Sequence, residues 1–90
     1  MQTQTTPKIE QIIEALAIMV SKKKGIDVAS IKGSSTMQSL NLDSLDVLDL
    51  IFGAEHKYKI RFPKHYGEVN TLQDVANLTH QLIIEQSNKG

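Results

Sequence analysis

The sequence predicts an all-α fold, a small bundle of three to four helices with a long loop between the first two. Apolar residues recur at helical spacing in three stretches, and segments rich in polar residues, glycine or proline separate them. No apolar stripe of this kind is stable unless it packs against another. At 90 residues the chain suits one domain, and we expect residues 1–90 to form it, with flexible tails at 1–6 and 87–90.

Composition narrows the function classes. Ten Lys and Arg balance ten Asp and Glu, so the basic excess typical of nucleic-acid binding is absent. There is no cysteine, which excludes disulfides, thiolate metal sites and cysteine nucleophiles. The sequence has neither a transmembrane-length apolar run nor an apolar signal core at its start. We expect a cytoplasmic protein with no membrane span and no nucleic-acid partner.

The first helix is expected to begin near Pro7, with Thr5 or Thr6 as its N-cap, and to end over residues 21–25. Cations in its last turn suit a helix C-terminus, and Gly25 can adopt the left-handed cap. We interpret the lysine run, residues 22–24, as a solvated helix end. The apolar stripe of this helix consists of Ile9, Ile12, Ile13, Leu16, Ala17 and Val20.

Residues 26–43 show no sustained periodicity and are expected to form a long loop. Loops of this length are usually functional or contain short helical turns. Scattered apolar residues indicate that the loop is pinned onto the core, and one helical turn is expected near Val28–Ile31.

The second helix is expected from Ser44 to Tyr58. Asp43 is a good N-cap residue, and Asp46, three positions on, adds a second carboxylate at the positive helix end. The apolar arc of this helix is wider than one buried face requires. The helix is therefore central to the bundle or meets a partner, and Leu45 and Phe52 are the candidates for exposure.

The rest of the chain predicts a connection and a third helix. Residues 59–62 are expected to form an extended connection, with room for one helical turn at 65–69. Thr71 and Asp74 form a capping-box pattern that opens a helix ending near Gln86.

No catalytic or metal site is predicted. Ser44 has no Gly-x-Ser-x-Gly elbow around it and no histidine placed by sequence to activate it. Asp46 and Asp49 lie one helical turn apart, on a face expected to be solvated. The histidines lack metal-ligand spacing; they are His56, His65 and His80.

Asp43-Ser44-Leu45 at the head of an amphipathic helix, in this order of elements, resembles the acyl carrier protein family. The resemblance covers most of the chain. The other matching positions are Leu40, Tyr58, Pro63, Val69 and the segment Thr71, Leu72 and Val75.

The resemblance implies that Ser44 carries a covalent 4′-phosphopantetheine arm, with Asp43 and Leu45 completing the attachment motif. The arm's thiol would hold acyl or polyketide groups as thioesters, so the chain would be a non-catalytic carrier. Its partners would be a phosphopantetheinyl transferase, an acyl-loading ligase or acyltransferase, and ketosynthase, ketoreductase and dehydratase enzymes. We expect the free chain to be a monomer.

The resemblance also suggests further roles for the second helix. The residues expected to dock partners are Leu45, Asp46, Asp49, Phe52 and Glu55. The residues that could line a cavity for the acyl chain are Val47, Ile51, Ala54 and Ile60. Taken singly, these four are better explained as plain core packing.

Two departures from the family are informative. Asn41 stands where the family usually has glycine, and asparagine tolerates a left-handed turn. The second helix ends in cations rather than glutamates, which suggests a specialised carrier with a dedicated set of enzymes. Two alternatives stay open: a carrier of aminoacyl or peptidyl groups, and an unmodified helical interaction module in which Ser44 only begins a helix.

Overall fold

The computed structural model describes residues 6–65 and 68–87, so the predicted tails lie almost wholly outside it. It contains helix α1 (Ile9–Lys24), the 3₁₀ turn η1 (Val28–Ser30), helix α2 (Ser44–Tyr58) and helix α3 (Leu72–Ser87). The described residues form no β-strand, only an isolated bridge between Thr36 and Thr71. The predicted all-α bundle, with its long loop between the first two long helices, is confirmed.

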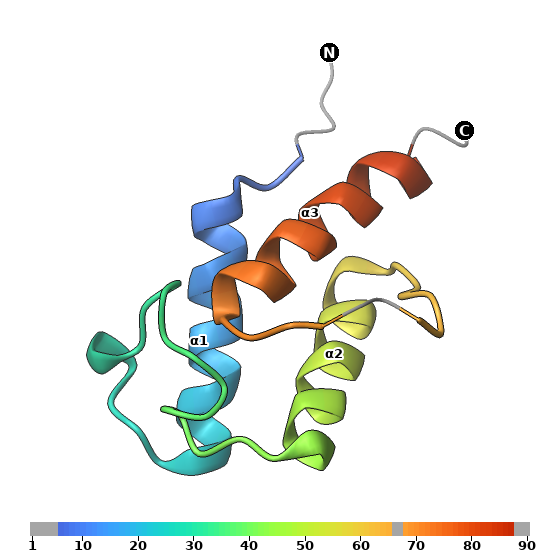
Figure 1. Cartoon of the computed structure of the whole chain (residues 1–90). Helices are drawn as coiled ribbons and strands as arrows, with labels where there is room; N and C mark the ends of the chain where they lie inside the picture. Colours follow the sequence, from blue (N-terminus) through green and yellow to red (C-terminus); the bar gives the residue numbers. More distant parts are fainter. Residues whose placement is uncertain (1–5, 66–67, 88–90) are drawn as a thin grey trace.

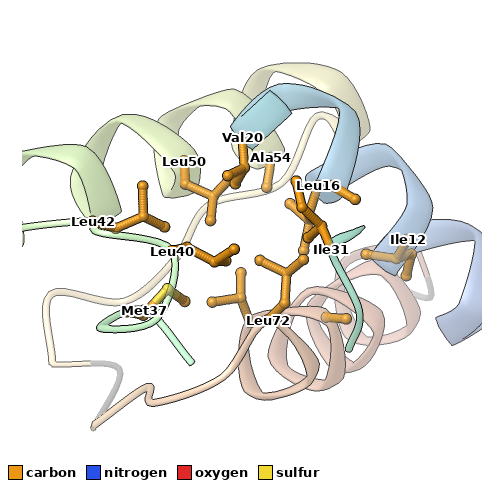
Figure 2. Packing of buried hydrophobic residues seen from close by; sticks show 13 residues of the cluster. Ile12, Leu16, Val20, Ile31, Met37, Leu40, Leu42, Leu50, Ala54 and Leu72 are labelled. Carbon is orange, nitrogen blue, oxygen red and sulfur yellow. The ribbon is translucent and has the colours of Figure 1, made fainter. Parts of the chain in front are cut away.

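The three long helices surround one core (Figure 1). α1 packs most extensively against α3, and α2 packs against both. Figure 2 shows apolar side chains from α1, α2, α3 and the long loop converging between the helices. The cluster consists of Ile12, Leu16, Ala17, Val20, Ile31, Met37, Leu40, Leu42, Leu50, Ala54, Leu72, Val75 and Ala76.

The start of α1 differs from the prediction: the helix begins at Ile9 with Lys8 as its N-cap, and Gln11 Oε1 accepts the N–H of Lys8 at 2.9 Å. The end of α1 follows the prediction. Gly25 has φ of 70°, and its N–H donates to the carbonyl of Ser21 at 2.8 Å. A residue with a Cβ would be strained there. The predicted turn near Val28–Ile31 is present as η1, capped by Asp27, whose carboxylate accepts the N–H of Ala29.

The long loop is tied to the start of α3. The N–H of Met37 donates to the carbonyl of Asn70 at 2.8 Å, and the N–H of Leu72 donates to the carbonyl of Ser35 at 3.1 Å. Met37 is itself buried. The apolar residues of the loop therefore pin it to the core, as the sequence indicated.

The described residues of the segment after α2 form neither helix nor strand, and side chains hold the segment in place. Phe62 N–H donates to Glu55 Oε2 at 2.7 Å. Gln86 of α3 accepts the N–H of Arg61 and donates to its carbonyl, at 3.1 and 3.0 Å. The helical turn predicted at 65–69 falls partly outside the described residues; positions 65, 68 and 69 are not helical.

Candidate functional site

Ser44 is the first residue of α2, and reciprocal hydrogen bonds fix the helix start there. Asp43 is extended, with φ of −92° and ψ of −175°, and its Oδ1 accepts the N–H of Asp46 at 2.9 Å. Asp46 Oδ2 in turn accepts the N–H of Asp43 at 3.2 Å. The predicted cap is confirmed. The carboxylates of Asp43 and Asp46 accept the backbone N–H groups at the helix start, so the hydroxyl of Ser44 takes no part in capping.

The side chain of Ser44 is exposed. Its hydroxyl makes no hydrogen bond within the described part of the chain. The first N–H groups of a helix lack helical acceptors, and the helix dipole places partial positive charge at this end. An anionic phosphodiester on Ser44 Oγ therefore fits both the space and the electrostatics of the site.

The turn before α2 places Ser44 on the surface. Leu40 and Leu42 are buried, exposing 4% and 8% of their surface, and anchor the chain on both sides of Asn41. Asn41 has φ of 60°, as its place in the sequence suggested. With Leu42 buried, the chain emerges at Asp43 and leaves Ser44 on the surface.

Two lysines at the end of α1 clamp the first half of α2. Lys24 Nζ lies 2.9 Å from Asp46 Oδ2, and Lys23 Nζ lies 2.7 Å from Asp49 Oδ2 and 3.5 Å from Asp46 Oδ1. The hydrogen bond from Lys24, then that from the N–H of Asp43, lowers the pKa of Asp46 below 3.8. The side chain of Asp46 exposes only 15% of its surface. Asp46 therefore departs from the expected solvated face, whereas the side chains of Lys23 and Asp49 remain on the surface, with 38% and 58% exposed.

The docking residues predicted on α2 fall into two groups. Leu45 and Phe52 expose 70% and 57% of their surface, which confirms their predicted exposure. The three carboxylates are engaged inside the chain, Asp46 and Asp49 with lysines of α1, and Glu55 with the N–H of Phe62. Sequence reasoning missed Leu48, which adds a third exposed apolar residue at 37%.

Two hollows flank α2. One of about 180 Å³ lies between α1 and α2, next to the lysine clamp, and is lined by Met19, Val20, Lys23, Leu42, Asp46, Asp49, Leu50 and Gly53. A groove of about 270 Å³ on the other side is lined by Leu48, Ile51, Phe52, Glu55, Phe62, Pro63 and Lys64.

Of the four cavity residues named from the sequence, only Ile51 lines either hollow. Ile51, Ala54 and Ile60 expose 5% or less of their surface, and Val47 packs half-buried against the core.

The described residues were also searched for metal sites and for membrane-spanning helices. Among the described residues, no group of three or more His, Asp or Glu side chains could hold a metal ion. None of the helices in the described part of the chain has the length and apolar character to cross a membrane.

Comparison with known proteins gives acyl carrier proteins among the relatives of this chain. The chain is 33% identical over 65 residues to the acyl carrier protein of Helicobacter hepaticus, covering 70% of this chain and 86% of that one. It is 34% identical over 68 residues to the acyl carrier protein of Clostridium acetobutylicum, covering 73% and 88%.

A plant relative is longer. The chain is 28% identical over 79 residues to chloroplastic acyl carrier protein 1 of Casuarina glauca, covering 86% of this chain but 58% of the relative. The chain therefore spans little more than half of that protein. No family model matches the chain.

Proposed function

Because the chain belongs to the acyl carrier protein family, we propose that Ser44 carries a 4′-phosphopantetheine arm and presents acyl groups to partner enzymes. The observation that carries the proposal is the exposed Ser44 hydroxyl, within Asp43-Ser44-Leu45, at a capped helix start. When attached, the arm supplies a thiol that holds the acyl group as a thioester.

Attachment needs a nucleophile that an external enzyme can reach. In the proposed reaction Ser44 Oγ attacks the pantetheine-linked phosphorus of coenzyme A, and the pyrophosphate bond breaks. Adenosine 3′,5′-bisphosphate leaves, and the hydroxyl proton passes to a base of the transferase, which also supplies magnesium. The chain contributes an unencumbered hydroxyl and the positive end of α2, which favours the phosphodiester anion.

The rest of α2 supports presentation rather than chemistry. We propose that partners dock on the exposed apolar residues beside Ser44, above all Leu45 and Phe52. Tethering would raise the concentration of the cargo at a docked enzyme to the order of millimolar. A docking surface of a few side chains suits a carrier that must visit several enzymes and leave each of them.

Sheltering of the cargo inside the bundle is a further proposal. Val47, Ile51, Ala54 and Ile60 would have to move apart to admit an acyl chain, because three of them are buried. Each methylene buried in exchange would contribute about 0.8 kcal/mol. The pathway we propose is fatty acid, polyketide or related specialised lipid synthesis, with the cations that follow α2 favouring a dedicated set of enzymes.

The test is acyl loading of the modified protein. We expect protein treated with a phosphopantetheinyl transferase, coenzyme A and magnesium to accept fatty acyl groups from an acyl-loading ligase. Intact mass spectrometry should show one acyl addition that hydroxylamine removes, since hydroxylamine cleaves thioesters. Protein not treated with the transferase is the control and should take up none.

Two results would change the assignment. Loading by amino-acid-activating enzymes and not by acyl ligases would make the chain an aminoacyl carrier. A folded chain that no transferase modifies would be an unmodified interaction module.

A further inference from the structure

Three exposed apolar residues form a stripe along α2. Leu45, Leu48 and Phe52 expose 70%, 37% and 57% of their surface and recur at helical spacing. Leu48 and Phe52 also border the groove of about 270 Å³ between α2 and the segment that follows it. This stripe begins one residue after Ser44, so anything that docks on it sits beside the proposed attachment point.

Two of the three carboxylates on α2 are offset by lysines of α1. Asp46 and Asp49 are paired with Lys24 and Lys23 at 2.9 and 2.7 Å, and Glu55 accepts the N–H of Phe62. A basic partner would have to compete with these internal contacts. Steering of a basic partner by α2 is correspondingly weak, because the paired lysines oppose its approach.

The basic segment, residues 56–65, contains four Lys and Arg residues, two histidines and no Asp or Glu. Its cations are exposed and make no ion pair within the described residues; they are Lys57, Lys59, Arg61 and Lys64. Lys64 lines the same groove as Phe52. Glu55 and Gln86 hold the backbone of this segment at Phe62 and Arg61, close to Lys64, whose charge lies at the groove beside the stripe.

We propose that the partner enzymes of this carrier present an apolar groove rimmed by carboxylates, into which the stripe fits with the basic segment against the acidic rim. The proposal rests on the carrier function and names the chemistry of its partners. Complementary charge would raise the rate of encounter, and a partner with a basic patch would meet like charge at residues 56–65.

The charge pattern favours a protein over an anionic lipid surface. Asp43, which has no ion pair among the described residues, is exposed at the Ser44 end of the stripe, while the unpaired cations follow its other end. A flat anionic surface covering the stripe would meet both. A shaped protein groove can place carboxylates at one end only.

The test uses a ketosynthase of general fatty acid synthesis chosen for a basic carrier-binding surface, and a form of it in which those cations are changed to glutamates. The phosphopantetheine-bearing chain is titrated against both forms, and against phosphatidylserine–phosphatidylcholine vesicles, at low and near-physiological salt. We expect binding to the acidic form to be about tenfold tighter, with the difference shrinking as salt rises.

Two charge-reversed variants sharpen the test. The double variant Arg61→Glu/Lys64→Glu should bind the basic form of the ketosynthase more tightly than the acidic form. The control Lys8→Glu/Lys32→Glu makes the same change in net charge on exposed lysines elsewhere, and should keep the preference for the acidic form. Circular dichroism checks that both variants fold. The proposal is overturned by equal or tighter binding to the basic form, by no binding to the acidic form, or by binding to vesicles instead. Mass spectrometry of the same sample shows whether Ser44 was modified, so failure of this proposal is distinguishable from failure of the carrier function.

Discussion

The starts of α2 and α3 use nearly the same local chemistry. At α2, Asp43 and Asp46 exchange hydrogen bonds between side chain and backbone at 2.9 and 3.2 Å. At α3, Thr71 and Asp74 do the same at 3.0 and 3.1 Å. In each case the residue before the helix and the one three positions later satisfy each other's backbone donors.

Their surroundings differ. The long loop closes over the start of α3, with Leu72 N–H bonded to Ser35 and Gln73 N–H bonded to Gly33, and Leu72 is fully buried. Nothing in the described chain covers Ser44, and Leu45 exposes 70% of its surface. A capping box defines where a helix starts. Burial decides whether that start packs inside the fold, as in α3, or remains accessible to an enzyme, as in α2.

The largest expected contrast comes from truncating one leucine at each start. Leu72→Ala should lower the free energy of unfolding by about 2–5 kcal/mol, because it empties a fully buried site. Leu45→Ala should change it by less than about 0.5 kcal/mol, since the side chain is largely in water. Urea unfolding of the two variants measures both values, and equal costs would contradict the comparison.

Removing the caps should separate stability from function. Asp43→Ala and Thr71→Ala should each cost about 1 kcal/mol in urea unfolding, because each leaves a helix-start donor without its acceptor. Only Asp43→Ala should also slow phosphopantetheine attachment, measured as the kcat/KM of the transferase. If Thr71→Ala slowed attachment as much, the attachment site would not be local to α2.

Acid should have the smallest effect and should reveal what holds each carboxylate. The pKa of Asp46 is lowered mainly by Lys24, and that of Asp74 mainly by the backbone N–H groups of Asn70 and Thr71. Each group therefore stabilises the fold above its unfolded pKa, about 3.8, and this stability is lost as the pH falls through the lower folded value.

Salt distinguishes the two groups. The Asp46 contribution depends on an ion pair near the surface and should shrink in high salt, while that of Asp74 should persist. Urea unfolding of Asp46→Asn and Asp74→Asn across the acid range, at low and high salt, measures this. A salt-sensitive Asp74 contribution would be the contrary result.

Local signals in the sequence predicted much of this structure. The bounds of α2, the left-handed Gly25 and Asn41, and both helix starts each depend on residues within a few positions of one another. The side chains of Leu45 and Phe52 were expected to be exposed because the apolar arc of α2 is too wide to bury.

The contacts that could not be predicted join distant parts of the chain. Lys23 meets Asp49 only because α1 packs beside α2, and single residues of a polar face do not reveal their partners on another helix. Lys59, the residue after α2, has φ of 57°, a left-handed conformation that favours glycine. A lysine at this position does not predict such a cap. The hollow between α1 and α2 likewise depends on how two helices meet.

The claim that Ser44 is the attachment site is tested most directly by site-resolved mass spectrometry. The chain, Ser44→Ala and Ser34→Ala, which removes an exposed serine elsewhere, are each incubated with a phosphopantetheinyl transferase, coenzyme A and magnesium. We predict one addition to the native chain and to Ser34→Ala, none to Ser44→Ala, and fragment ions that place it on Ser44. An addition that persists in Ser44→Ala, or no addition to any folded protein, would contradict the account.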